Sequence, residues 1–264
     1  MIKKKILKII NDKLLNSYQH GIFPTIQYKK LNELITKIKA YDLGYNLIRV
    51  GPNGDGGYLI PNLLEEIKIC FSPGVGYIHG FENDLLKRGI KVYMADRTVE
   101  KPNLDSNNYE YIKKNIGSYD DSQTITIDNW IKDVEHAGNF LLQMDVEGSE
   151  YEIINRIKEA NLNKFKILVI EFHYFEQILT KIGYKVVKNV FEKILKYFDV
   201  AHIHPNNCCG SYNFNNIVIP STLEMTFLRK DLVIKKERIL KYPNKLDFKN
   251  VEKNKDIVLD KVWY

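Results

Sequence analysis

The chain has 264 residues and a formal net charge of +6. This length fits one large α/β domain with extensions, and the mild charge excess does not by itself identify a nucleic-acid-binding protein. Its three cysteines, Cys70, Cys208 and Cys209, offer neither a disulfide framework nor a C-x-x-C metal pair. We therefore expect a protein of the reducing cytoplasm.

Two segments near the start, residues 1–18 and 27–41, carry apolar residues at helical spacing, with lysines between them. Polar residues interrupt the first apolar run too early for a secretory signal, and no segment approaches the roughly 20 apolar residues of a membrane-spanning helix. We expect two helices that pack on the main domain. A basic amphipathic helix that binds an acidic membrane surface is the alternative for residues 1–18.

From residue 66 onward, strand and helix patterns alternate, which predicts a mostly parallel sheet with helices on both faces. The expected strands are IKICFS (67–72), KVYMAD (91–96), TITID (124–128), NFLLQMD (139–145), KILVIEFH (166–173) and DVAHIH (199–204), followed by a closing β pair of NIVIP (216–220) and LEMTFLRK (223–230). We divide the chain into a helical extension, residues 1–44, and one main domain, residues 45–264.

A glycine turn, PGVGYIHG, follows the first of these strands. Gly74 and Gly76 are able to bring backbone N–H groups close to a ligand that a side chain would exclude. Asp96 ends the second strand roughly twenty residues later, where an acid accepts hydrogen bonds from ribose hydroxyls. Together these residues predict a nucleoside-containing cofactor. The turn lacks the G-x-G-x-x-G spacing of a dinucleotide site, which favours an adenosyl sulfonium cofactor.

Acidic residues and histidines stand at three later strand ends. Asp145 closes the fourth strand, Glu171 and His173 close the fifth, and His204 closes the sixth. The carboxyl ends of parallel strands meet at one edge of the sheet, so we expect these side chains to face the glycine loop.

These segments resemble the FkbM family of S-adenosylmethionine-dependent methyltransferases. The resemblance covers roughly residues 45–260 and is carried by CFSPGVG, FENDLLKRGIKVYMAD, TITIDNW, MDVEGSEYEII, ILVIEFH, AHIHPNN and IPSTLEMTFLRK. It implies a Rossmann-like class I methyltransferase fold, with a mostly parallel seven-stranded sheet, helices on both faces and a late antiparallel strand. It also implies S-adenosylmethionine as the cofactor and a carbohydrate as the substrate, for example a nucleotide-linked sugar for a capsule or another surface polysaccharide.

One position departs from the family pattern, because Cys70 stands where many members have an acid that helps to hold the amino group of the cofactor. Glu82 is our candidate for that role, and an exposed position in the first turn of a helix is the alternative. Asp121 is placed near adenine N6 or in a solvated turn. The complete set of residues expected around the cofactor is Ser72, Gly74, Gly76, Glu82, Asp96, Arg97 and Asp121.

Methyl transfer from a sulfonium to a hydroxyl needs positioned reactants and a group that removes the hydroxyl proton. The candidate catalytic residues are Asp145, His173 and His204. A divalent metal that polarises the hydroxyl is the other solution. Mg²⁺ or Mn²⁺ would suit oxygen and nitrogen ligands from Asp145, Glu171 and one histidine, which we assign to His204.

The residues expected to bind the acceptor lie in loops at the same edge: Asp55, Tyr58, Glu147, Asn206 and Asn207. For the segment GPNGDGGY (51–58), a hairpin turn without a binding role is the alternative. Glu147 and Glu150 also suit the start of a helix, where carboxylates favour the dipole, and for Glu150 we favour that role.

Two other functions fit parts of the sequence. Asp145-Val-Glu147 imitates the acidic triplet of a metal-dependent nucleotide-sugar glycosyltransferase, and the net positive charge permits a basic RNA-binding module. Against the second, the positive residues form no single stripe. We expect a small carbohydrate substrate, no nucleic-acid partner and no stable membrane insertion. Amide N-methylation and a homo-oligomer are left open.

Overall fold

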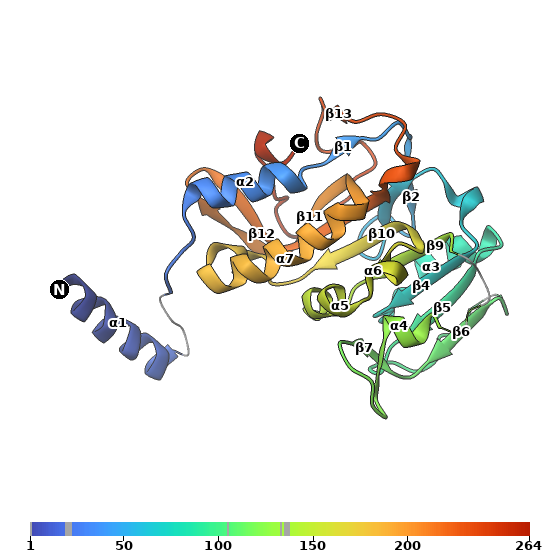
Figure 1. Cartoon of the computed structure of the whole chain (residues 1–264), viewed down its shortest axis with the longest axis horizontal. Coiled ribbons are helices and arrows are strands. Elements are labelled where there is room, and N and C mark those ends of the chain that lie inside the picture. The colour runs from blue at the N-terminus through green and yellow to red at the C-terminus, as the bar shows by residue number, and fades with distance from the viewer. Residues whose placement is uncertain (1, 19–22, 105, 133, 135–137) are drawn as a thin grey trace.

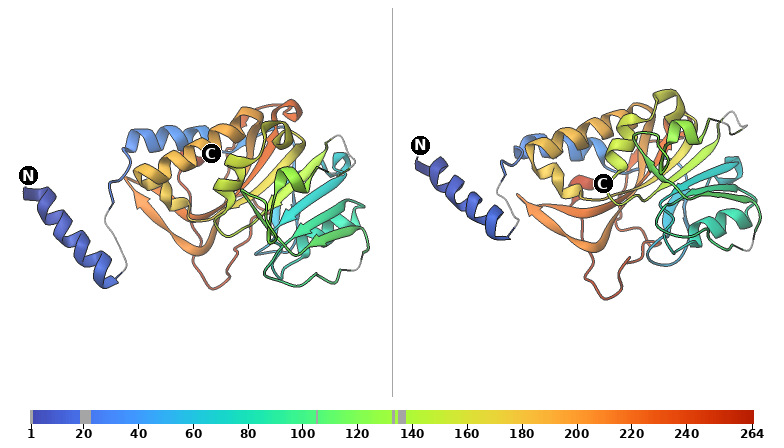
Figure 2. Two further views of the ribbon diagram at one scale, coloured as in Figure 1. Left: turned by 60° about the horizontal axis from the view of Figure 1, so that its bottom comes forward. Right: turned by 90° about the horizontal axis from the view of Figure 1, so that it is seen from below.

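The structure is a computed structural model that describes residues 2–18, 23–104, 106–132, 134 and 138–264. A seven-stranded sheet forms its centre, with helices on both faces (Figures 1 and 2). In space the strands follow the order β11-β12-β10-β9-β4-β5-β6. Their bounds are β4 (Ile69–Pro73), β5 (Lys91–Ala95), β6 (Tyr109–Ile112), β9 (Phe140–Met144), β10 (Phe165–Phe172), β11 (Phe198–Phe214) and β12 (Ile217–Arg229).

Neighbouring strands from β6 to β10 run parallel, whereas β12 is antiparallel to both β10 and β11. Parallel strands covered on both faces read as continuous apolar runs, and β9 and β10 are buried along their whole length. The expected mostly parallel sheet with a late antiparallel strand is therefore confirmed. The strand order reverses between β4 and β9, and such a switch point is where open α/β sheets bind ligands.

The expected third strand, TITID, is not in the central sheet. Its first residues form β8 (Thr124–Thr126), which pairs with β7 (Asn115–Gly117) in a separate two-stranded sheet. Helix α4 (Ile127–Trp130) follows at once, because the Thr126 side chain caps it. The third strand of the main sheet is β6, which is only partly buried. Its sequence lacks the apolar run of a central strand, which explains the wrong prediction.

The expected closing pair is also wrong, because NIVIP and LEMTFLRK belong to one strand, β12, whose partner is β11. The two strands meet at Asn215 and Asn216, whose φ values of 51° and 65° suit a tight hairpin turn. Pro220 lies inside β12, beside an irregularity in the pairing between Asn206 and Ser211. A proline is tolerated at such a bulge, so it does not end the strand.

Helices and short 3₁₀ turns surround the sheet. They are α1 (Ile2–Tyr18), α2 (Tyr28–Ile38), α3 (Gly80–Lys87), α5 (Glu150–Arg156), α6 (Glu159–Leu162), α7 (Lys181–Tyr197), η1 (Leu64–Glu66), η2 (Phe175–Leu179), η3 (Lys230–Leu232) and η4 (Lys261–Trp263). Both expected N-terminal helices are present. Helix α2 buries an apolar face and contacts α7 and η4, whereas α1 stands apart from the body with Ile6, Leu7 and Ile9 about half exposed (Figure 1). None of the described helices is both long and apolar enough to cross a membrane.

Two small β pairs complete the fold. Strands β2 (Leu47–Val50) and β3 (Tyr58–Pro61) form an antiparallel hairpin around the segment GPNGDGG, which confirms the expected hairpin turn; its binding role stays a prediction. Strand β1 (Tyr41–Asp42) pairs with β13 (Glu237–Arg238) near the other end of the chain. The first 44 residues thus reach into the body through α2 and β1, and the boundary after residue 44 stays a prediction.

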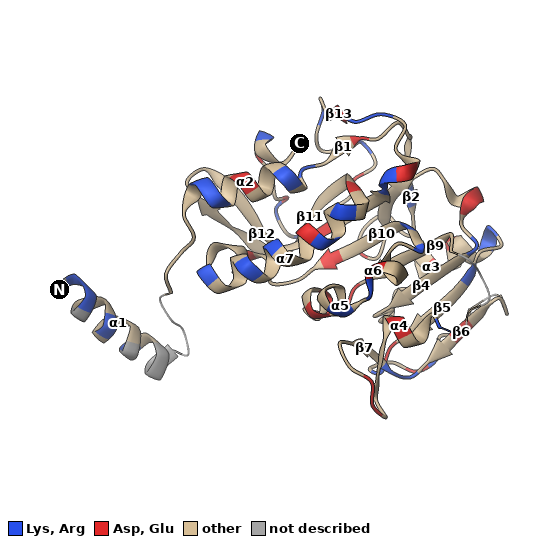
Figure 3. Ribbon diagram, in the orientation of Figure 1, with Lys and Arg blue, Asp and Glu red and all other residues tan. Residues whose placement is uncertain are grey.

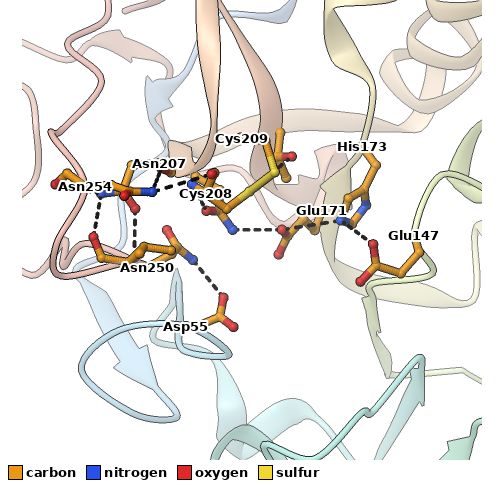
Figure 4. The surroundings of a disulfide bond; sticks show 12 residues. Asp55, Glu147, Glu171, His173, Asn207, Cys208, Cys209, Asn250 and Asn254 are labelled. Atoms are coloured by element: carbon orange, nitrogen blue, oxygen red, sulfur yellow. Dashed lines mark hydrogen bonds and ion pairs between the residues drawn. A yellow bond between two sulfur atoms is a disulfide. The ribbon is translucent and has the colours of Figure 1, made fainter. Parts of the chain in front are cut away.

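Cys208 and Cys209 are joined by a disulfide, contrary to the expectation that the cysteines form no such bond (Figure 4). In a regular strand, neighbouring side chains point to opposite faces. Here both residues lie where the pairing of β11 with β12 is irregular, so that alternation is broken. Cys70 is a free, buried thiol. The cytoplasmic location stays a prediction.

Candidate active site

A cavity of about 520 Å³ lies at the carboxyl ends of β4, β5 and β9. Small-molecule sites in proteins typically have volumes of about 300–1,000 Å³. The walls come from the glycine loop, helix α3, the ends of β5 and β9, the β2–β3 hairpin and the β7–β8 pair. The lining residues used below are Asp55, Tyr58, Gly74, Gly76, Glu82, Asp96, Tyr119, Gln143, Asp145 and Glu147.

Gly74 and Gly76 give the loop after β4 its shape, with φ values of 80° and 51°. A Cβ on Gly74 would lie 1.5 Å from the carbonyl oxygen of Asp145, whereas one on Gly76 would meet nothing within 4 Å. The N–H of Gly74 donates to the carbonyl of Ala95, and that of Gly76 donates to Asp96. Both N–H groups are thus bonded within the protein, and their contact with a ligand stays a prediction. The glycines allow close packing and leave room for a ligand.

Asp96 lines the cavity directly after β5 and is 8% exposed. Its Oδ2 accepts from Gly76, and its Oδ1 accepts from the N–H and the hydroxyl of Thr98. A carboxylate offers about four acceptor positions, so one remains for a ligand hydroxyl. Arg97 is exposed and is not among the lining residues. Asp121 accepts from two backbone N–H groups in a turn, and Tyr119 lines the cavity in that region instead.

Glu82 is buried, at 2% exposure, so the alternative of an exposed helix position is wrong. Its Oε1 lies 2.5 Å from the Ser72 hydroxyl, while its Oε2 has no hydrogen-bond partner among the described residues. Burial raises the pKa of Glu82 to about 7. Ser72 also contacts Gln143, a lining residue that the sequence analysis missed. The signal was a single amide in the apolar strand FLLQM.

The imidazole of His173, just after β10, bridges two sets of carboxylates. Its Nδ1 lies 2.9 Å from Oε1 of Glu150. Its Nε2 lies 3.7 Å from Oδ1 of Asp145, 3.7 Å from Oε1 of Glu171 and 3.4 Å from Oε2 of Glu147, as Figure 4 shows for the last two. Three atoms that could bind a metal ion, one each from Asp145, Glu171 and His173, lie within 4.8 Å of one another. The histidine beside Asp145 and Glu171 is thus His173, and His204, the histidine that we assigned there, is not in this group.

These neighbours change the proton affinities of the cluster. Burial raises the pKa of Asp145 to about 7, with His173 opposing the shift and Glu147 and Glu150 adding to it. Burial also raises the pKa of Glu171, and nearby carboxylates add to the effect. For His173, burial opposes the charged form, but the hydrogen bond to Glu150 and the surrounding carboxylates outweigh it and raise the pKa. The cluster is therefore able to exchange a proton near neutral pH.

Glu150 does more than start a helix. It is fully buried, and its Oε1 accepts hydrogen bonds from the backbone of Val146 and Gly148 as well as contacting His173. One carboxylate thus fixes the loop after Asp145 and orients the imidazole, which leaves Nε2 directed at the other carboxylates.

Glu224 of β12 is a second residue that the sequence analysis missed. It pairs in register with Glu171 on one side and with His204 on the other. Burial raises its pKa to about 8. A single carboxylate inside the apolar run of β12 was the available signal, since acids are rarely buried without a partner.

His204 lies in a separate network with the C-terminal segment. Asn250 donates through Nδ2 to Glu224 at 2.6 Å and to Asp55 at 3.2 Å, so its Oδ1 faces Nε2 of His204 at 3.1 Å (Figure 4 shows the contact with Asp55). His204 must therefore carry a proton on Nε2. Burial lowers the pKa of His204, which keeps it neutral. Asp247 of the same segment pairs with His202.

Asn206 and Asn207 bind the protein itself. Asn206 donates to Glu171 at 2.9 Å and accepts from the N–H of Cys208. Asn207 exchanges hydrogen bonds with the backbone of Val251 and also donates to the carbonyl of Asn254. Both amides thus hold the acceptor side of the site in place. Asp55, Tyr58 and Glu147 line the cavity, as the prediction of a role in the acceptor site requires.

The sheet order, the cavity at its switch point and the acid after β5 are those of a Rossmann-like class I methyltransferase fold. Residues 80–207 match the family model described as the methyltransferase FkbM domain. This part of the chain is similar to that family, and the match supports a methyltransferase that uses S-adenosylmethionine.

Solved structures similar to this chain share little sequence with it. Fibrillarin in complex with Nop5p is 10% identical with a TM-score of 0.36, over 62% of this chain and 73% of that one. A putative RNA methyltransferase from Pyrococcus horikoshii is 9% identical with a TM-score of 0.33, over 87% and 99%. A TehB-like SAM-dependent methyltransferase from Corynebacterium glutamicum is 11% identical with a TM-score of 0.34, over 87% and 100%. No curated protein matches the chain.

Proposed function

We propose that the protein transfers the methyl group of S-adenosylmethionine to a hydroxyl group of a carbohydrate. The observation that carries this proposal is Asp145. This carboxylate stands on the cavity wall, has a pKa near neutrality and lies beside an imidazole that Glu150 orients. Removal of a hydroxyl proton during methyl transfer needs such a group.

The cavity fits the cofactor at two points. The free acceptor position of Asp96 suits a ribose hydroxyl, and the unpaired Oε2 of Glu82 suits an ammonium group. Gly76 leaves the wall open between these acids. When bound, S-adenosylmethionine supplies an electrophilic methyl group.

In the reaction, Asp145 accepts the hydroxyl proton. Asp145 thereby becomes neutral. The imidazole of His173 lies 3.7 Å from its Oδ1, and Glu150 holds this ring through Nδ1 and stabilises its protonated form. His204 does not suit this role, because its Nε2 already carries a proton that is directed at Asn250.

The charge of the cavity favours a neutral acceptor. Of the described residues that line it, six are acidic and none is lysine or arginine: Asp55, Glu82, Asp96, Asp145, Glu147 and Glu152. Lysine and arginine are instead distributed over the outer helices, including α1, α2 and α7 (Figure 3). Carboxylates accept hydrogen bonds from sugar hydroxyls and repel phosphates. If the sugar is nucleotide-linked, its phosphates must lie outside this cavity. The role in capsule or other surface polysaccharide synthesis comes from the family resemblance.

A divalent metal is the second candidate for activating the hydroxyl. Asp145, Glu171 and His173 offer two oxygens and one nitrogen in a compact group, which suits Mg²⁺ or Mn²⁺. Glu150 on the far side of the ring is the orienting contact that metal-bound histidines usually have.

The deciding experiment incubates the protein with S-adenosylmethionine and a panel of free and nucleotide-linked sugars and measures S-adenosylhomocysteine. EDTA, followed by Mn²⁺ or Mg²⁺, separates the two ways of activating the hydroxyl. Activity that survives EDTA rejects the metal. Asp145→Asn should lower turnover at least about 100-fold without loss of fold, since general base catalysis typically contributes 10²–10⁴-fold. No product with any sugar, together with product from an amine, would reject O-methylation.

A further inference from the structure

Five buried side chains form a hydrogen-bonded chain from the cofactor side of the cavity to the acceptor side. The Ser72 hydroxyl lies 2.5 Å from Oε1 of Glu82 and 2.6 Å from Oε1 of Gln143. The Nε2 of Gln143 lies 3.4 Å from the Tyr58 hydroxyl, which lies 3.5 Å from Oε2 of Glu171. The chain therefore begins at the acid that faces the cofactor and ends in the cluster around Asp145.

The number of hydrogen atoms in these hydrogen-bonded side chains restricts the charge of Glu82. Ser72 has a single hydroxyl hydrogen, and two oxygens lie within hydrogen-bond distance of it. If Glu82 were a carboxylate, one of these short O···O contacts would contain no hydrogen. A protonated Glu82 removes the conflict, because its O–H donates to Ser72 and Ser72 donates to Gln143. Burial, which raises the pKa of Glu82 to about 7, favours the same state.

In this protonated state all the hydrogen bonds point in one direction. Gln143 donates through Nε2 to the Tyr58 hydroxyl, and that hydroxyl donates to Glu171. Each of the four contacts then contains one hydrogen, so this arrangement describes the protein without its cofactor.

An ammonium group beside the unpaired Oε2 of Glu82 favours the carboxylate form of that acid. Glu82 then loses its proton to solvent, and Ser72 donates to it. The Oε1 of Gln143 now faces a lone pair of Ser72. A turn of the amide by 180° restores the hydrogen bonds of Gln143, because Nε2 then donates to Ser72 and Oε1 accepts from Tyr58, and the hydrogen bond from Tyr58 to Glu171 is lost.

We propose that Gln143 is a positioning residue that couples the two halves of the site. Cofactor binding at Glu82 reverses its amide and turns the Tyr58 hydroxyl from Glu171 toward Gln143. Glu171 then loses the hydrogen bond from Tyr58, which changes the cluster around Asp145, so the cofactor binds first and prepares the acceptor site. This inference rests on the proposed function.

Other titratable groups around Glu82 do not provide the same response. Cys70 on β4 and Tyr58 on β3 stay neutral, because burial raises the pKa of each well above its ordinary value. Asp96 after β5 and Asp145 after β9 line the same cavity, but neither is hydrogen-bonded to Ser72 or Gln143 among the described contacts. Glu82 is therefore the group whose protonation changes when the amino group of the cofactor binds.

The test counts the protons released when S-adenosylhomocysteine binds, by calorimetry in two buffers of different ionisation enthalpy at each pH: phosphate and bis-Tris at pH 6, and phosphate and Tris at pH 8. With a pKa of about 7, Glu82 should release about 0.9 proton at pH 6 and about 0.1 at pH 8. Methylthioadenosine, which lacks the amino acid part, should release none, and Glu82→Gln should release none with either ligand. Equal proton release with the two ligands would overturn the inference.

Gln143→Leu is the decisive variant, because it lets Ser72 donate permanently to Glu82. Proton release at pH 6 should then fall clearly below 0.9, whereas a merely structural role would lower affinity and leave the proton count unchanged. If Gln143→Leu does not fold, Ser72→Ala replaces it. That variant removes the hydrogen bond that stabilises the carboxylate form of Glu82 and so raises its pKa further. Proton release should then persist at pH 8. Ser221→Ala, at a buried serine of β12, is the matched control and should behave as wild type.

The outcomes separate this inference from the proposed function. If S-adenosylhomocysteine does not bind the wild-type protein, the proposed function fails and this inference fails with it. If it binds and releases the same number of protons from the wild type and from Gln143→Leu, only the inference fails. A further expected result is that Tyr58→Phe keeps the proton count and raises the KM for the sugar more than it lowers kcat.

Discussion

Gly74 and Gly76 offer a direct test of how the glycine loop packs, because both have positive φ and only one has a close neighbour. Alanine in the left-handed region costs about 1 kcal/mol at either position. At Gly74 the new Cβ would lie 1.5 Å from the carbonyl oxygen of Asp145, which is backbone and must shift. Overpacking of this kind typically costs about 1–3 kcal/mol more. We expect Gly74→Ala to lose about 3 kcal/mol of unfolding free energy and Gly76→Ala about 1 kcal/mol.

Urea unfolding of the two variants, followed by circular dichroism, measures this difference of about 2 kcal/mol, which corresponds to roughly a 30-fold change in the unfolding equilibrium. Cofactor binding should show a different pattern. The Cβ of Gly76→Ala enters the cavity, so this variant should bind S-adenosylhomocysteine more weakly despite its smaller loss of stability. Equal losses of stability in the two variants would refute the proposed packing of Gly74 against β9.

Three further predictions concern buried acids. Glu150→Gln places an NH₂ group where Oε2 has no partner, so we expect a loss of about 1–3 kcal/mol in urea unfolding together with lower kcat; unchanged stability would contradict the buried position of this acid. Because the pKa of Glu82 is raised from 4.5 to about 7 in the folded state, the stability that its neutral form contributes is fully present below about pH 4.5 and is lost as the pH rises to about 7. Unfolding of the cofactor-free protein at pH 5 and 8 should therefore show a decline that is about 2–3 kcal/mol smaller in Glu82→Gln, and parallel declines would reject the raised pKa. Asp96→Ala should weaken S-adenosylhomocysteine binding about tenfold or more in calorimetry, since a hydrogen bond to a charged group contributes about 1.5–3 kcal/mol, and unchanged affinity would mean that the ribose lies elsewhere.

The central strands could be predicted from the sequence because strands that are buried on both faces consist of consecutive apolar residues. Strands β9 and β10 lie between other strands and are covered on both faces, so they appear as unbroken apolar runs. Strand β6 at the edge of the sheet has no such run, so we assigned the more apolar segment TITID to its place in the sheet. The internal proline of β12 led us to predict two strands where there is one. A bulge that tolerates proline depends on the partner strand, which the local sequence does not show.

The candidate site divides in the same way. The class of fold, the glycine loop and three carboxylates at strand ends were predictable from the amino-acid sequence, because these features lie within single strand-to-loop segments. The carboxylates are those of Asp96, Asp145 and Glu171. Which histidine lies beside Asp145 could not be predicted in this way, because it depends on contacts in the folded protein with residues 23 positions from His173 and 46 positions from His204. The burial of Glu82 and the pairing of Glu224 likewise depend on which strands become neighbours, and contacts between distant segments leave no periodic pattern in a single sequence.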